Sequence, residues 1–233
     1  MPRILKYKKI SSTNSVLKDM INKSPIDFPD TVIISYKQTE GRGRLKRVFS
    51  SPEGGLYISL CFKEDEFKYP TATAAVYAML AIADIGVQTK IKWLNDLYFN
   101  NKKVCGILAE KVHSYVIIGI GINITTEKSE FPKEIQNKAI SLFPGEKSRL
   151  EELRNKLSKS LIENFYQKKP SNIFSLYKEN CFTLNTQITV NSFDKTYEAM
   201  AIGINQDFEL IIKDSENKIC TLSTGEIILN QLQ

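Results

Sequence analysis

Arginine and glycine alternate in one short segment that separates two apolar runs. Residues 38–47 read QTEGRGRLKR, while residues 31–36 and 56–62 are rich in β-branched and aromatic residues and predict strands. Glycine lets a backbone approach a ligand closely, and each arginine presents a fork of donors that matches a carboxylate or a phosphate. The segment therefore suits the binding of a polyanion. Taken alone, it is equally consistent with a solvated basic loop.

Three further polar clusters interrupt apolar stretches. Residues 12–14 (STN) precede an amphipathic pattern, residues 92–96 (KWLND) lead to Lys103 across a turn, and residues 119–123 (GIGIN) lie inside an apolar run. Each cluster also has a structural interpretation: a helix cap, a turn, and a bulge or close backbone packing. The last cluster is not a dinucleotide fingerprint, because it lacks the third glycine and does not open a helix.

In this order and at these intervals, the clusters resemble the motifs of the biotin–protein ligase family (biotin–[acetyl-CoA-carboxylase] ligase). The family's STN element matches residues 12–14, GRGRxxR matches 41–47, KWPND matches 92–96, KxxGIL matches 103–108 and GxGxN matches 119–123. Five collinear motifs are highly specific. The resemblance is strong over the first half of the chain, and the C-terminal part matches the family's small β-domain only loosely.

The chain departs from the family pattern at two positions. Leu94 stands where proline is usual, and Phe49 stands where tryptophan is common. Leucine lacks the fixed φ of proline, so the turn before Asn95 is expected to be less rigid. Both replacements keep an apolar side chain, and we therefore expect a changed ligand affinity with the activity retained.

The resemblance implies a two-step ligase reaction with biotin and ATP as substrates and with Mg²⁺. The biotin carboxylate attacks the α-phosphorus of ATP to give biotinyl-5′-AMP. A lysine amine on a biotin carboxyl carrier domain, of acetyl-CoA carboxylase or a related carboxylase, then takes the biotinyl group. By the resemblance, Arg42, Arg44, Lys103 and Asp96 are the catalytic residues. Cations suit this task because they reduce the repulsion between two anions that must meet.

The same resemblance assigns the binding residues. The biotin-binding set combines hydroxyl, amide, cationic and glycine residues: Ser12, Thr13, Asn14, Gln38, Arg42, Gly43, Arg44, Lys103 and Gly106. Hydroxyl and amide groups supply both donors and acceptors, as a ureido group requires. The ATP-binding set comprises Arg44, Arg47, Lys92, Trp93, Asn95 and Asn123. Asp96 is the candidate ligand of Mg²⁺, a hard ion that prefers carboxylate and phosphate oxygens.

Hydrophobic periodicity predicts the elements that must position these residues. Helical patterns cover residues 12–21, 71–85, 150–169 and 172–179, and the third opens with a capping box from Ser148 to Glu151. Strand patterns cover residues 31–36, 56–62, 89–93, 97–99, 104–108 and 115–124, with a hairpin turn at residues 100–103. The helices are not spaced as βαβ crossovers. We therefore expect an α+β fold with a mixed or antiparallel sheet packed with helices, which the resemblance makes class II synthetase-like.

The end of the chain differs in pattern and in charge. Five short strand patterns follow residue 185 and predict a small β-barrel, which the resemblance makes SH3-like. This segment carries three lysines and seven acidic residues, whereas the whole chain has a net charge of +6. The contrast favours a separate module. We expect a catalytic biotin- and ATP-binding domain at 1–184 and a C-terminal β-domain at 185–233.

Composition excludes several other classes. Four scattered cysteines form no CxxC pair, which argues against a zinc site and a disulfide framework. No apolar run reaches the ~18 residues of a membrane span, and the start lacks a signal peptide's apolar region, so a cytoplasmic protein is expected. Eleven residues precede Ser12. A winged helix-turn-helix needs several times that length, so we expect no DNA-binding domain. A homodimer stays open.

Two rival functions also stay open. A lipoate–protein ligase would use the same adenylation logic, but no lipoate-type RRxSGGG loop is found. A non-enzymatic nucleic-acid-binding protein would use the basic loop. Aromatic residues are not interleaved with its arginines, as stacking platforms for bases would require.

Overall fold

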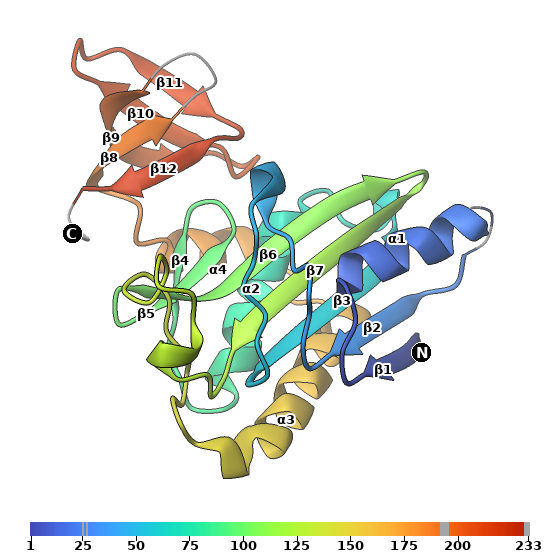
Figure 1. The fold of residues 1–233 in the computed structure, drawn as a ribbon. Helices are drawn as coiled ribbons and strands as arrows, with labels where there is room; N and C mark the ends of the chain where they lie inside the picture. The colour runs from blue at the N-terminus through green and yellow to red at the C-terminus, as the bar shows by residue number, and fades with distance from the viewer. Residues whose placement is uncertain (25, 27, 192–195, 231–233) are drawn as a thin grey trace.

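The computed structural model describes residues 1–24, 26, 28–191 and 196–230, which form two sheets with helices on both faces of the larger one (Figure 1). The larger sheet has seven strands in the order β1-β2-β3-β7-β6-β5-β4: β1 Arg3–Tyr7, β2 Thr31–Ser35, β3 Gly55–Lys63, β7 Tyr115–Asn123, β6 Lys102–Val112, β5 Asp96–Phe99 and β4 Lys90–Lys92. β1 pairs with β2 in parallel and the other neighbours are antiparallel. The expected mixed sheet is confirmed. β1 is an element that the sequence did not predict.

Helix α1, Thr13–Lys23, covers one face of this sheet (Figure 1). Ser12 caps it, because its hydroxyl accepts a hydrogen bond from the Ser15 amide at 3.4 Å. Leu17 and Ile21 lie one turn apart and are fully buried. They pack on the α1 side of the sheet, against a cluster of Ile33, Cys61, Val112, Tyr115 and Ile117.

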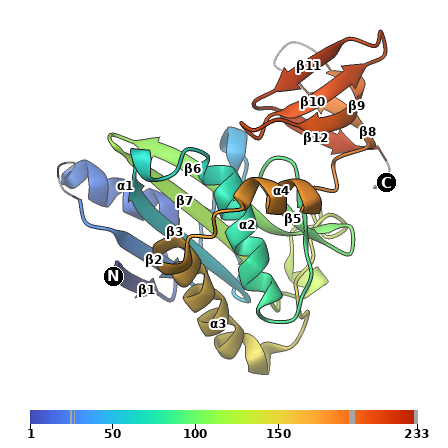
Figure 2. The same cartoon turned by 180° about the vertical axis from the view of Figure 1, so that it is seen from behind.

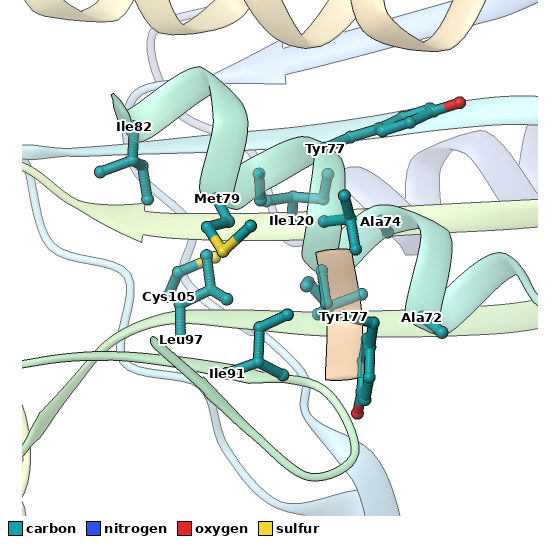
Figure 3. Packing of buried hydrophobic residues seen from close by; sticks show 14 of the residues in the cluster. Ala72, Ala74, Tyr77, Met79, Ile82, Ile91, Leu97, Cys105, Ile120 and Tyr177 are labelled. Carbon is teal, nitrogen blue, oxygen red and sulfur yellow. The ribbon is translucent and has the colours of Figure 1, made fainter. Parts of the chain in front are cut away.

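Three helices cover the opposite face: α2 Pro70–Ala83, α3 Leu150–Glu163 and α4 Ile173–Asn180 (Figure 2). α2 begins with proline, which costs no hydrogen bond there because amide groups in the first turn of a helix have no acceptor within the helix. Gly86, at φ +86°, follows the helix. It is apolar nearly all round because it is buried between the sheet, α3 and α4. In Figure 3, Met79 and Ile82 of α2 share one apolar layer with Cys105 and Ile120 of the sheet. Full burial of such a side chain contributes about 1.5–3 kcal/mol.

The predicted capping box of α3 is wrong. A 3₁₀ turn, Lys147–Arg149, leads directly into the helix, and the Leu150 amide bonds to the Lys147 carbonyl. The residue before the helix already has helical backbone angles and makes no side-chain cap. Ser148 therefore has no exposed first turn to cap. The helical segment ends as expected, at Lys169 in the left-handed conformation.

The smaller sheet confirms the five predicted C-terminal strands, in the order β11-β10-β9-β8-β12: β11 Ile219–Leu222, β10 Leu210–Asp214, β9 Thr196–Ile204, β8 Thr186–Asn191 and β12 Glu226–Leu229. It is not a closed barrel, because β12 pairs with β8 and no pairing joins it to β11 within the described residues. The turn between β11 and β12 reaches the basic loop of the larger sheet instead. No helix of the described chain is long and apolar enough to cross a bilayer.

Candidate functional site

The site lies on the α1 side of the large sheet, along one cross-strand row. Strand register aligns Lys92, Asp96, Gly106, Gly121 and Tyr57 across β4, β5, β6, β7 and β3. Register partners in a sheet project from the same face. The two adjacent glycines therefore leave a bare patch of backbone, with a cation and a carboxylate on one side of it.

A second row passes beneath the start of α1. Here Leu108, Gly119 and Ser59 are register partners on β6, β7 and β3. A Cβ atom at Gly119 would lie 2.2 Å from the Asn14 side-chain oxygen, far inside any real contact. Glycine at this position thus makes room for the Asn14 amide against the sheet.

A partly buried polar network surrounds that amide. Asn14 Nδ2 donates to Glu110 Oε2 at 2.7 Å, and Ser59 Oγ donates to Asn14 Oδ1 at 2.6 Å. Ser59 also lies 2.7 Å from the Thr13 hydroxyl. The Thr13 amide donates to Gln38 Oε1 at 2.7 Å. The network ties the first turn of α1 to the chain that enters the basic loop.

The basic loop, residues 36–54, connects β2 to β3 and is closed by its own backbone. The Phe49 amide bonds to the Gly41 carbonyl at 2.9 Å, and the Gly43 amide bonds to the Arg47 carbonyl at 2.8 Å. A Cβ at Gly41 would lie 2.3 Å from the Phe49 carbonyl oxygen. Glycine at position 41 is therefore required for this close crossing.

Arg154 of α3 secures both ends of this loop from the other side of the sheet. The residue is 5% exposed, and its guanidinium donates to the Gly55 carbonyl at 3.0 Å and the Tyr36 carbonyl at 3.4 Å. Burial lowers the pKa of this guanidinium. The two points where the loop leaves the sheet are thus held by one buried cation.

Phe49 lies on the bare backbone patch. Cβ atoms built at Gly106 and Gly121 would come within 2.8 Å and 2.4 Å of its ring. The ring meets Tyr57 edge-on at a centroid distance of 6.4 Å, and the Lys103 ammonium lies 5.7 Å from its centroid. The end of the basic loop is therefore seated on the glycine floor.

Arg44 joins the loop to both sheets. It donates to Asn95 Oδ1 at 3.2 Å, to Thr224 Oγ1 at 3.0 Å and to the Gly225 carbonyl at 3.2 Å. Asn95 in turn donates to the Ile107 carbonyl at 2.6 Å. The Arg44 guanidinium is thereby oriented between β6 and the turn before β12.

The other cations have acidic or aromatic neighbours. Arg47 and Glu226 form a two-pronged ion pair, whose hydrogen bonds raise the pKa of Arg47 and lower that of Glu226. The Lys103 ammonium lies 2.6 Å from Asp96 Oδ1 at an angle unsuited to a directed hydrogen bond, so this is a charge contact. Lys92 lies 5.8 Å from the centroid of the Tyr98 ring, and burial lowers its pKa.

One cavity of about 200 Å³ collects these groups. Of the residues predicted from the sequence, it is lined by Ser12, Thr13, Asn14, Gln38, Arg42, Gly43, Arg44, Arg47, Lys92, Trp93, Asn95, Asp96, Lys103 and Gly106. Asn123 does not line it: this buried amide donates to the Ile140 carbonyl at 3.2 Å. Trp93 is 3% exposed and its indole N–H donates to the Phe208 carbonyl at 2.9 Å, so the ring can act as a wall.

Sequence reasoning assigned no role to several residues of this site. Tyr57, Glu226 and the turn before it line the cavity, and Ser59 and Glu110 stand behind it. Residues 223–227 lie in the C-terminal part of the chain, which matches the family's small β-domain only loosely. Their contact with the basic loop joins positions 179 residues apart, which no local motif reveals.

Five cationic side chains and two carboxylates line the cavity, a formal net charge of +3. Such a site favours an anion, while the hydroxyl and amide groups below α1 suit a neutral polar head. No cluster of three or more metal-binding His, Cys, Asp or Glu side chains occurs in the described part of the chain. Mg²⁺ bound with a polyphosphate needs only one or two protein carboxylates, and the cavity contains two, Asp96 and Glu226.

Comparisons with known proteins agree with this geometry. Residues 7–123 match the model of the biotin/lipoate A/B protein ligase family. The bifunctional ligase/repressor BirA of Bacillus spizizenii is 31% identical over 226 residues, covering 89% of this chain and 68% of BirA. The biotin–[acetyl-CoA-carboxylase] ligase of Mycobacterium tuberculosis is 29% identical, covering 58% of this chain and 53% of that protein.

Solved structures share the fold. The biotin protein ligase of Aquifex aeolicus, in complex with biotin and ATP, superposes with a TM-score of 0.73 at 24% identity and covers 99% of each chain. The Leishmania major enzyme with biotinyl-5-AMP gives a TM-score of 0.64 at 20% identity, covering 96% of this chain and 100% of that one. From the matched residues and the BirA relationship together, the chain belongs to the biotin/lipoate A/B protein ligase family.

Proposed function

We propose that this protein is a biotin–protein ligase that joins biotin to ATP as biotinyl-5′-AMP and transfers biotin to a lysine of a biotin carboxyl carrier domain. One observation carries the proposal. In a single cavity, hydroxyl and amide groups from the start of α1 form a polar end over Gly119, and arginine and lysine side chains form a cationic end around Asn95, Asp96 and Glu226. That is the arrangement required by a substrate with a neutral ureido head and a carboxylate that must meet a polyphosphate.

The polar end of the cavity accounts for the ureido head. Ser12, Thr13 and Gln38 line it and offer both donors and acceptors. The Phe49 ring, seated on the backbone of Gly106 and Gly121, and the neighbouring Leu108 would supply apolar walls for the fused rings. A site that hydrogen-bonds a polar head discriminates strongly against ligands lacking it, because its own buried groups are then left unpaired.

The cationic end accounts for the chemistry. Two unit charges 4 Å apart repel by about 1 kcal/mol in water and by about 4 kcal/mol at the dielectric of a partly buried site. Arg42, Arg44 and Lys103 would neutralise the carboxylate and the charge that develops at the α-phosphorus. Arg47 and Lys92 would bind the remaining phosphates. The carboxylate oxygen forms the new bond to phosphorus, and pyrophosphate leaves.

Asp96 and Glu226 hold the cations in place before substrate arrives. Incoming anions would take over Lys103 and Arg47, and Asp96 would then be available as a ligand of Mg²⁺. The ion supplies further neutralisation of phosphate charge. Trp93 would form a wall of the nucleotide site, since its N–H is already bonded to Phe208.

The second half-reaction needs an amine that can reach the mixed anhydride in the cavity. A carrier lysine would attack the mixed anhydride carbonyl, forming an amide and releasing AMP. We assign the cavity and its sheet to a catalytic domain at 1–184 and the five-stranded sheet to a C-terminal domain at 185–233. The C-terminal turn at Thr224 and Gly225 would complete the arginine end of the site.

Mass spectrometry of a biotin carboxyl carrier domain tests the proposal. The domain is incubated with this protein, ATP, Mg²⁺ and biotin, and we expect one added biotinyl group on one lysine. A parallel reaction with lipoate and a lipoyl carrier domain tests the rival substrate. Modification with lipoate alone, or neither modification with intact protein and substrates, contradicts the proposal. The Arg44→Ala variant is expected to release biotinyl-5′-AMP at least about tenfold faster, because a charge-assisted contact is lost.

A further inference from the structure

Glu110 contacts the site from outside the cavity. It lies on β6 in the same face as Gly106 and Leu108, two residues beyond the row that contains Gly119. Its carboxylate accepts a hydrogen bond from Asn14 Nδ2 at 2.7 Å. It does not line the cavity, so any influence on a ligand must act through Asn14.

The orientation of the Asn14 amide follows from its neighbours. The Glu110 carboxylate and the Leu108 carbonyl, which lies 3.5 Å from Asn14 Nδ2, both accept hydrogen bonds. The NH₂ group of Asn14 must therefore face them, and its oxygen must face Ser59 on the other side. The Ser59 hydroxyl, 2.6 Å from that oxygen, has to donate its single proton there.

This orientation passes to Thr13. Ser59 has no second proton for the Thr13 hydroxyl, although the two oxygens are only 2.7 Å apart. Thr13 therefore donates its own proton, either to Ser59 or to Gln38 Oε1 at 3.1 Å. Its oxygen keeps lone pairs toward the cavity, which Thr13 lines. Both polar ends of the Asn14 amide are meanwhile engaged with Glu110 and Ser59.

We propose that Glu110 is a positioning residue that, through Asn14 and Ser59, makes Thr13 a hydrogen-bond acceptor for an N–H group of the ligand. The inference rests on the proposed function, which identifies that group as a ureido N–H of biotin. Loss of the carboxylate frees the Asn14 amide to turn over. Ser59 then donates to Thr13, and Thr13 can offer its proton to the ligand instead.

Biotin and its cyclic carbamate analogues together test whether Thr13 accepts a hydrogen bond from the ligand. We compare the Kd of biotin with that of each cyclic carbamate analogue, in which a ring oxygen replaces one ureido N–H with little change in shape. In one of the two analogues the ring oxygen would face the lone pairs of Thr13. For that analogue, the unmodified protein is expected to have a Kd at least about 30 times that for biotin, and this quotient is the carbamate-to-biotin ratio. Glu110→Met is expected to reduce that ratio about tenfold. Glu64→Met, which removes the exposed partner of Lys111, is the matched control and should leave the ratio unchanged.

A swapped pair separates positioning from simple structural support. Asn14→Asp alone sets two carboxylates against each other and should weaken biotin binding. Asn14→Asp combined with Glu110→Gln restores one acceptor and one donor, because the amide introduced at position 110 can donate to the new carboxylate while Ser59 still donates to it. The pair is expected to recover the carbamate-to-biotin ratio to within about threefold.

The outcomes divide cleanly. An equal loss of affinity for biotin and for the carbamates in Glu110→Met means structural support only, and overturns the proposal. So does a swapped pair that folds and binds biotin yet has the ratio of Glu110→Met. Failure of the unmodified protein to bind biotin overturns the proposed function, and this inference with it. If the unmodified protein binds biotin but Glu110→Met has the same carbamate-to-biotin ratio as the unmodified protein, this inference alone is overturned.

Discussion

The glycine floor makes a quantitative prediction at Gly121. An alanine Cβ there would lie 2.4 Å from one ring carbon of Phe49 and 2.9 Å from another, so the ring has to leave the patch. Full burial of a phenylalanine contributes about 1.5–3 kcal/mol. Phe49 is only partly buried, so expelling it should cost about 1–2 kcal/mol. Alanine also restricts the unfolded chain more than glycine does, which stabilises the folded state by about 0.4–1 kcal/mol and offsets part of that cost. Gly121→Ala should therefore destabilise the protein by about 1 kcal/mol.

Urea unfolding of a double-mutant cycle isolates this term. With Phe49→Ala already present there is no ring to displace, and Gly121→Ala should become neutral or stabilising. The expected coupling energy is about 1–2 kcal/mol. Gly203→Ala is the matched control: its Cβ would meet Ile211 at an ordinary 3.4 Å, and stability should change by less than about 0.5 kcal/mol. An equal cost of Gly121→Ala in both backgrounds would refute the placement of the ring.

Three further predictions concern charged groups. Lys92→Met should raise the free energy of unfolding at pH 7 by about 1 kcal/mol while abolishing adenylation. Burial lowers the pKa of the Lys92 amine, so its charged form destabilises the folded protein. The gain measured by urea unfolding should therefore vanish as the pH approaches 10.5. Glu226→Gln should cost no more than about 1 kcal/mol, since Arg47 is 59% exposed; the pKa of Glu226 is lowered, so this cost should be present above pH 4.5 and disappear in acid titrations below it. Arg154→Met should cost about 2–3 kcal/mol by leaving the buried Gly55 carbonyl unpaired, with faster proteolysis within residues 36–54.

Sequence patterns predicted most helices and strands because the caps and turns that bound them depend on residues close together in the chain. Ser12 caps α1 through its own neighbour Ser15. Asn100 and Asn101 adopt positive φ in the β5–β6 turn, as paired asparagines do readily. β1 was not predicted for a physical reason: it is an edge strand without a buried residue, and its arginine and lysine are exposed. An edge strand needs little apolar alternation, so its sequence carries little signal.

The motifs located most of the cavity, but not how its cations are held. Arg44 and Arg47 were predicted to face substrate. Their partners Thr224, Gly225 and Glu226 come from the far end of the chain and appear only when the two sheets are placed together. The small β-domain expected there is present, but its barrel is open, because the edge strands β11 and β12 do not pair with each other within the described residues. The turn between these two strands contacts Arg44 instead.

Register, more than any motif, builds the site. Gly119 and Gly121 alternate with Ile118, Ile120 and Ile122, whose side chains fill the core beneath α2. A slip of one residue would bury glycine in that core and place isoleucine on the floor, at a cost of several buried side chains. The core therefore enforces the pairing that also brings Ser59 and Glu110 behind Asn14. Neither residue belongs to the catalytic or binding motifs read from the sequence, yet the packing of the opposite face determines that both must be there.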